Sequence, residues 1–165
     1  MIRLVKRLVR DERGASIIEM ALVLPFFGAM IIGVADNSRA YSAKLKLEQA
    51  AYRAIEKVQQ YQATEDTYTT LKNEAVSAAN AAGFTDVTTS NVTVDYWLEC
   101  DGVRQGNGTP GNGYDTTCSS GQRYGRWVNV SLTHKFKPLF ASNIWPGSNS
   151  DGTYTLHASA GLRTQ

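Results

Sequence analysis

Glu19 is the residue whose chemistry stands out first, because it is the single charged side chain in a long apolar run. Residues 15–35 contain no other charge. A charged group at the centre of a lone membrane helix costs about 2.5–3.5 kcal/mol, and less near the end of the span, where Glu19 lies. One interpretation is that the Glu19 carboxylate reaches the membrane interface.

The second interpretation of Glu19 is an ion pair, and it needs a partner charge. If the chain is cut after Gly14, Ala15 becomes the first residue of the mature protein and Glu19 the fifth. The new α-amine at Ala15 of a neighbouring subunit would then neutralise Glu19 in a medium of low dielectric constant. This interpretation makes Gly14 and Ala15 a predicted peptidase cleavage site and Glu19 a predicted subunit-pairing residue.

The residues before this run concentrate the basic charge of the chain. The chain has 17 Lys and Arg against 15 Asp and Glu, a formal net charge of +2. Residues 1–14 alone hold five basic and two acidic side chains: Arg3, Lys6, Arg7, Arg10, Arg13, Asp11 and Glu12. A nucleic-acid-binding domain would instead spread its basic residues over a folded face. Because positive charge resists translocation, residues 1–14 should be a leader that stays in the cytoplasm, with the rest of the chain outside.

The run itself is long enough to cross a membrane as a helix. Residues 15–35 would rise about 30 Å, one hydrocarbon thickness. Pro25 removes the hydrogen bond to the carbonyl of Ala21, so it should kink or loosen the helix. An alternative remains open, because an ordinary signal peptidase could cut after Ala35, in Gly33-Val34-Ala35, and release a soluble protein. Against that alternative, residues 20–35 are longer than the usual apolar core of a signal peptide, and Glu19 and Pro25 fit one poorly.

Two cysteines lie in the exported part, Cys100 and Cys118, with 17 residues between them. An even count in an oxidising compartment predicts one disulfide that closes a surface loop, and two free thiols are the alternative. A zinc site would need both cysteines and both histidines, at spacings that do not fit, so we expect no metal. Gly106–Gly111 matches a nucleotide-binding glycine pattern without the helix that should follow, and His134 and His157 have no nucleophile signature nearby. We therefore expect no cofactor, no small-molecule substrate and no catalytic residue.

The elements that position these residues follow from periodicity. Apolar side chains recur every three or four residues over 36–62 and again over 65–82, and Gly83 is a plausible stop for the second helix. The period changes to two over 92–100, 124–136 and 154–162, which predicts three half-buried antiparallel strands. Helices followed by strands predict an α+β fold in which two helices pack on a small sheet. The predicted division is a leader at 1–14, a transmembrane helix at 15–35, a helical stalk at 36–83 and a β ectodomain at 84–165.

The N-terminal half resembles the TadE-like pseudopilins of tight-adherence pili, a class of type IV pili. The resemblance covers residues 10–60 and rests on Gly14, Glu19, Ala21, Leu22, Pro25 and Tyr41, with Met20 where the family more often has an aromatic residue. It implies a pilin-like fold and trimming of a class III signal by prepilin peptidase. It also implies that the chain lies in the bacterial inner membrane with its C-terminal domain in the periplasm, from where it could enter the extracellular pilus. It also implies partners, namely the major pilin, sibling pseudopilins, the inner-membrane platform proteins and membrane lipid, with pilus assembly and adhesion as the function.

A binding module is the alternative function. In it, a secreted or anchored domain recognises a surface or a glycan through the loop between the cysteines. Its contact residues would be three aromatic side chains that we expect to be exposed: Trp97, Tyr114 and Trp127.

Overall fold

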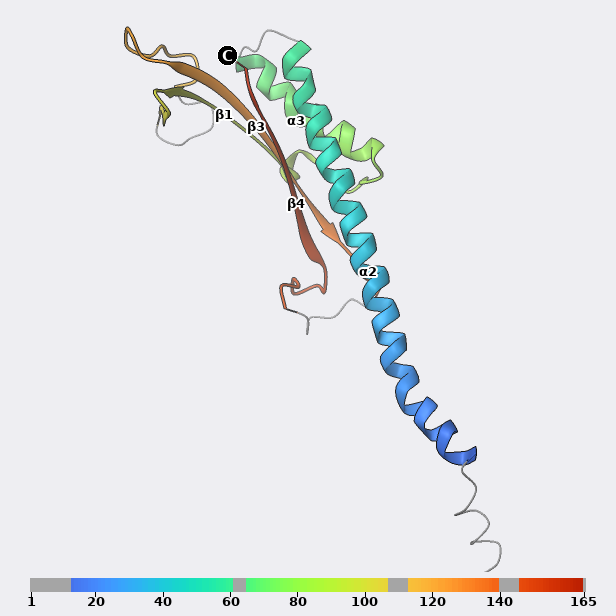
Figure 1. Cartoon of the computed structure of the whole chain (residues 1–165). Coiled ribbons are helices and arrows are strands. Elements are labelled where there is room, and N and C mark those ends of the chain that lie inside the picture. The colour runs from blue at the N-terminus through green and yellow to red at the C-terminus, as the bar shows by residue number, and fades with distance from the viewer. Residues whose placement is uncertain (1–12, 61–64, 107–112, 140–145, 165) are drawn as a thin grey trace, which may run out of the picture. The chain divides into compact units, whose positions relative to one another are not determined.

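The computed structural model describes residues 13–60, 65–106, 113–139 and 146–164. The chain divides into two compact units, Met1–Arg39 and Ala40–Gln165. Helix α2 (Arg13–Gln60) contributes to both units, and helix α3 (Glu65–Ala81), a short 3-10 helix η1 (Thr89–Asn91) and all strands belong to the second. Figure 1 shows the element order. The predicted α+β class is confirmed, whereas the predicted domain boundaries at 35 and 83 stay predictions.

The second unit holds a four-stranded antiparallel sheet. Its strands are β1 (Val92–Cys100), β2 (Val103–Arg104), β3 (Tyr124–Phe136) and β4 (Tyr154–Arg163), in the order β2-β1-β3-β4. The three longer strands confirm the predicted ones to within one residue. Alternating side chains point to the two faces of a strand, so a two-residue period over these segments was a sufficient signal.

Strand β2 lies between the strands predicted at 92–100 and 124–136, where no strand is predicted from the sequence. It pairs with the end of β1 through a two-residue turn, with Cys100 opposite Val103. Both turn residues, Asp101 (φ 50°) and Gly102 (φ 81°), have positive φ, as type I′ hairpin turns require. Two residues are too few to show an alternation, but Asp-Gly is itself a strong hairpin signal, and that dipeptide predicts the turn.

The core of the second unit lies between the helices and the inward face of the sheet (Figure 1). Helix α2 contributes Leu47, Ala50, Ala51, Ala54, Ile55 and Val58, and α3 contributes Leu71, Ala75 and Ala79. The sheet contributes Val92, Val94, Val128, Val130, Leu132, Ala158 and Ala160. Five of the nine helical residues are alanines, so the helices present small side chains to the core, and the predicted apolar faces are confirmed where the structure describes them. The periodic segments 36–62 and 65–82 also include Tyr61, which lies outside the described residues, and Tyr68, whose side chain is not described.

Helix α3 ends in a Schellman motif. The Gly83 amide donates to the carbonyl of Asn80 at 3.0 Å, and the Phe84 amide donates to the carbonyl of Ala79 at 3.0 Å. Gly83 has φ 101°, which favours glycine, so the predicted helix stop is confirmed. The motif turns the chain back onto the core, where Phe84 and Val87 are buried. Sequence periodicity did not reveal these two core residues, because they follow the helix and precede the first strand.

Candidate functional site: the N-terminal apolar helix

The first half of α2 exposes its large apolar side chains. Phe26, for example, is 75% exposed. The other exposed large apolar residues of this half, each at least 44% exposed, are Ile17, Ile18, Met20, Leu22, Val23, Leu24, Phe27, Met30, Ile31 and Val34. A contiguous exposed apolar surface of this size marks contact with a membrane or with other chains. Among the described residues, α2 is the one helix whose length and apolar composition would allow it to cross a membrane.

Glu19 lies within this apolar surface. Its side chain is exposed, and within the described residues it has no hydrogen bond or ion pair. Gly14 and Ala15 lie in the first turn of α2, which begins at Arg13. The predicted cleavage site and the predicted pairing residue are therefore about one helical turn apart on the same element. The leader, residues 1–12, lies outside the described residues.

The helix continues through Pro25. A proline in a helix interior leaves one backbone carbonyl without its usual donor, and neighbouring helices can repair this loss within a membrane. Downstream, a Cβ placed on Gly28 or Gly33 would meet no other atom within 4 Å. The described part of the chain thus gives no packing reason for glycine at these positions, and both are open to close approach by another helix.

This helix is also where the chain resembles known proteins. Residues 14–55 match the TadE-like protein family. The match begins at Gly14 and includes Ala15, Glu19, Pro25 and Tyr41, so the resemblance inferred from these residues is confirmed over that segment. No curated protein and no solved structure matches the chain. The TadE-like segment ends within α2, before α3 and the sheet.

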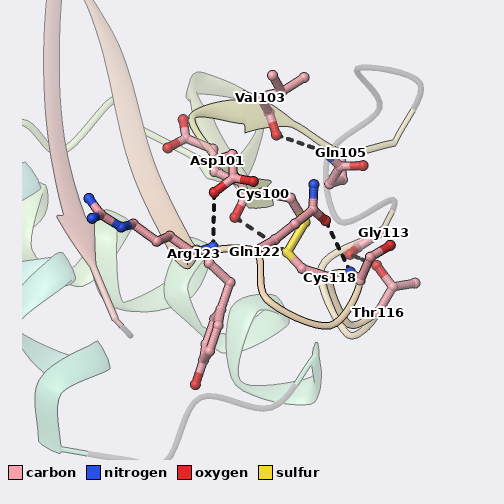
Figure 2. The surroundings of a disulfide bond; sticks show 12 residues. Cys100, Asp101, Val103, Gln105, Gly113, Thr116, Cys118, Gln122 and Arg123 are labelled. Atoms are coloured by element: carbon pink, nitrogen blue, oxygen red, sulfur yellow. Dashed lines mark hydrogen bonds between the residues drawn. A yellow bond between two sulfur atoms is a disulfide. The ribbon is translucent and has the colours of Figure 1, made fainter.

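The predicted disulfide lies in the other unit. Cys100 and Cys118 are bonded, with their Cα atoms 5.7 Å apart, and Figure 2 shows the bond between the end of β1 and the following loop. The loop is fastened around it, because the Arg123 amide donates to the Asp101 carboxylate at 2.9 Å and the Ser119 amide donates to the Gln122 side chain at 3.0 Å. The alternative of two free thiols is therefore wrong.

Tyr114 corrects the predicted set of exposed aromatic residues. It is 2% exposed, and its ring packs edge-on against Tyr96 at 5.5 Å between centroids. Arg126 of β3 holds the surrounding loop, because its guanidinium donates to the carbonyl of Tyr114 at 3.0 Å and to that of Thr116 at 3.3 Å. Tyr114 is therefore an anchor that fastens the disulfide loop to the core and is not available as a contact residue. Nothing in a glycine-rich loop sequence distinguishes such an anchor from an exposed aromatic side chain.

The two histidines lie on strands, His134 on β3 and His157 on β4. The Nδ1 atom of His134 lies 3.2 Å from the Asp86 carboxylate but outside hydrogen-bonding alignment, and the ring packs against Phe84 at 4.7 Å between centroids. His157 is exposed on β4, opposite Thr133. The described residues hold no cluster of three or more His, Cys, Asp or Glu side chains that would bind a metal.

Proposed function

We propose that this chain is a minor pseudopilin of a Tad-type pilus, which acts by helix packing and subunit contact and not by catalysis. The observation that carries the proposal is the TadE-like match, which begins at Gly14, in the first turn of a helix whose N-terminal part is exposed, apolar and has one carboxylate. A side-chain surface of this kind gains stability only when lipid or other helices cover it. The binding-module alternative loses support, because Tyr114 is buried and the family match points to a pilus system.

The first step of the proposed mechanism is insertion. The basic leader holds the N-terminus in the cytoplasm, the apolar part of α2 spans the inner membrane, and the second unit folds in the periplasm. Prepilin peptidase then cuts after Gly14 and releases the amine of Ala15. The proposed partners are this peptidase, the major pilin, sibling pseudopilins, the platform proteins and membrane lipid.

The second step is assembly. Glu19 pairs with the Ala15 amine of a neighbouring subunit, which removes the cost of an unpaired carboxylate in an apolar bundle. Its lack of a partner within the described residues of its own chain supports this proposal. The open surface around Gly28 and Gly33 gives neighbouring helices room to approach. The assembled pilus would then carry the second unit outward for assembly contacts and adhesion.

The N-terminus of the mature protein tests the first step. We expect intact-mass analysis of the membrane-extracted protein to place it at Ala15, and a bulky Gly14→Leu replacement to leave the leader attached. A start at Asp36 would show signal-peptidase cleavage and overturn the proposal. Unchanged processing of Gly14→Leu would also contradict it.

Glu19→Gln tests the second step, because it keeps the side-chain size and removes the charge. We expect the variant to enter the membrane and to be processed normally, but to reduce the number of pili. Ser16→Ala, one turn away on the same helix, is the matched control and should assemble normally. Normal piliation with Glu19→Gln would refute the pairing.

A further inference from the structure

The outward face of the sheet, which is opposite the core, carries a row of aromatic and cationic side chains across three strands. Trp97 of β1 pairs in register with Trp127 of β3, and Trp127 pairs with Arg163 of β4. The two indole rings are nearly parallel, with 9° between their planes and 6.2 Å between their centroids. The rings stack against each other, half-buried, on the side that the helices do not cover.

Glu99 fixes the orientation of this aromatic pair. Its carboxylate accepts the indole N–H of Trp127 at 2.9 Å through Oε2 and that of Trp97 at 3.3 Å through Oε1. Arg104 of β2 covers the ring of Trp97 at 4.6 Å and is held in turn by Asp95 at 2.8 Å. Both rings are therefore set in place before any ligand arrives, and such preorganisation lowers the entropic cost of binding.

A hollow of about 460 Å³ opens beside Trp127 at the end of the sheet. Its lining includes one further aromatic residue, two carboxylates and two guanidinium groups: Tyr124, Glu99, Asp101, Arg123 and Arg163. Gly125 of β3 leaves the room that Arg163 occupies, because a Cβ there would come within 2.9 Å of the Arg163 Nε. The guanidinium of Arg163 donates to the carbonyl of Tyr124 at 2.9 Å, which holds it at the hollow.

We propose that this hollow, with the ring of Trp127 in its lining, binds a carbohydrate chain. The lining carries two positive and two negative groups, so its charges balance, as suits a ligand without net charge. The C–H faces of a sugar ring pack on flat aromatic rings, and the hydroxyls bond to carboxylate and guanidinium groups. A purely apolar ligand would take four charged groups away from water, and a phosphate-rich ligand would meet Glu99 and Asp101. The site keeps Trp127 of the binding-module alternative but not its buried Tyr114, and it uses no residue of the pilus proposal, so it would be a second activity of a pilus protein.

The test is direct binding by the purified full chain in detergent, against six-sugar β-1,4-linked N-acetylglucosamine and glucose oligomers and an α-1,4-linked glucose oligomer. Insoluble chitin, cellulose and isolated peptidoglycan serve for co-sedimentation. We expect at least one of these carbohydrates to bind and to change the intrinsic tryptophan fluorescence. Trp127→Ala should weaken that binding about tenfold or more, and Trp127→Phe, which keeps a flat ring, should weaken it less. Tyr52→Ala removes an aromatic side chain of α2 that is 55% exposed, and it should leave binding unchanged.

Two results would overturn this inference. One is the absence of binding to every carbohydrate of the panel at millimolar concentration. The other is equal binding by the wild type and Trp127→Ala, with a far-ultraviolet spectrum of Trp127→Ala that shows an intact fold. In the first case, reduced piliation by Trp127→Ala would identify a protein contact instead. Because the assay needs no pilus, its failure is distinguishable from failure of the pseudopilin proposal.

Discussion

The first unit of this chain exposes its large apolar side chains, and the second unit buries them. In Met1–Arg39, the described large apolar residues of α2 lie on the surface, and in Ala40–Gln165 the apolar faces of the same helix, of α3 and of the sheet close over a common core. The first unit therefore has little internal packing energy to lose, and its side chains act on other molecules. The second unit gains its stability from within. Truncating an apolar side chain should therefore lower the thermal stability of the second unit, but should weaken membrane association or assembly in the first. Four experiments test the two units in these terms.

The largest effect should come from a core cavity. Leu132 of β3 is completely buried, and Leu132→Ala should lower the free energy of unfolding by about 4 kcal/mol, since it removes packed atoms and leaves a void. The measurement is the near-ultraviolet circular dichroism melt of the detergent-solubilised chain, because all three tryptophans lie in the second unit.

Leu22→Ala is the matched control for this comparison. Leu22 is 66% exposed in the first unit, and its truncation removes no core contact. We expect the melting of the second unit to stay unchanged, while membrane association or pilus assembly weakens. Equal loss of thermal stability in the two variants would show that the units do not differ as described.

The disulfide should give the next largest effect, again confined to the second unit. The double variant Cys100→Ser with Cys118→Ser removes the cross-link between two residues that are 18 positions apart. We expect the free energy of unfolding to fall by about 3 kcal/mol. Denaturant unfolding with and without a reducing agent measures it. If the double variant unfolds at the wild-type denaturant concentration, the anchoring of the loop by Tyr114 and Arg126 already supplies the constraint.

The sequence predicts the features of the first unit better than it predicts the contacts between distant residues of the second unit. In the first unit, Gly14, Glu19 and Pro25 are visible because each residue type is unusual in an apolar run, and no tertiary contact is needed to notice them. In the second, a period of two places the three long strands, since alternation is a local property. The burial of Tyr114 and the pairing of Trp97 with Trp127 depend on the register between strands, which no local pattern encodes.

A smaller effect is expected at the end of α3. Gly83→Ala places a Cβ on a residue with φ 101°, which costs about 1 kcal/mol, although no neighbouring atom lies within 4 Å. The same thermal melt measures it. Gly28→Ala is the counterpart in the first unit, where the backbone is helical, so it should leave the melt unchanged and act only on assembly. A wild-type melt for Gly83→Ala would show that the Schellman motif adds nothing to the stability of the core.

The smallest effect is electrostatic and lies at the exposed turn before β4. Asp151 accepts hydrogen bonds from the hydroxyl and amide of Thr153 and from Lys135, and these lower its pKa from 3.8 to about 2. A pKa that is lower in the folded state stabilises the protein fully above the unfolded value, and this contribution disappears as the pH falls from about 4 to 2. We expect the carboxyl carbon of Asp151 to titrate near pH 2 by nuclear magnetic resonance, and Thr153→Val to move the midpoint up towards 3.8. A midpoint that Thr153→Val leaves unchanged would assign the shift to Lys135, whose ammonium lies 3.0 Å from the carboxylate, and would make the turn depend on salt concentration instead of hydrogen bonding.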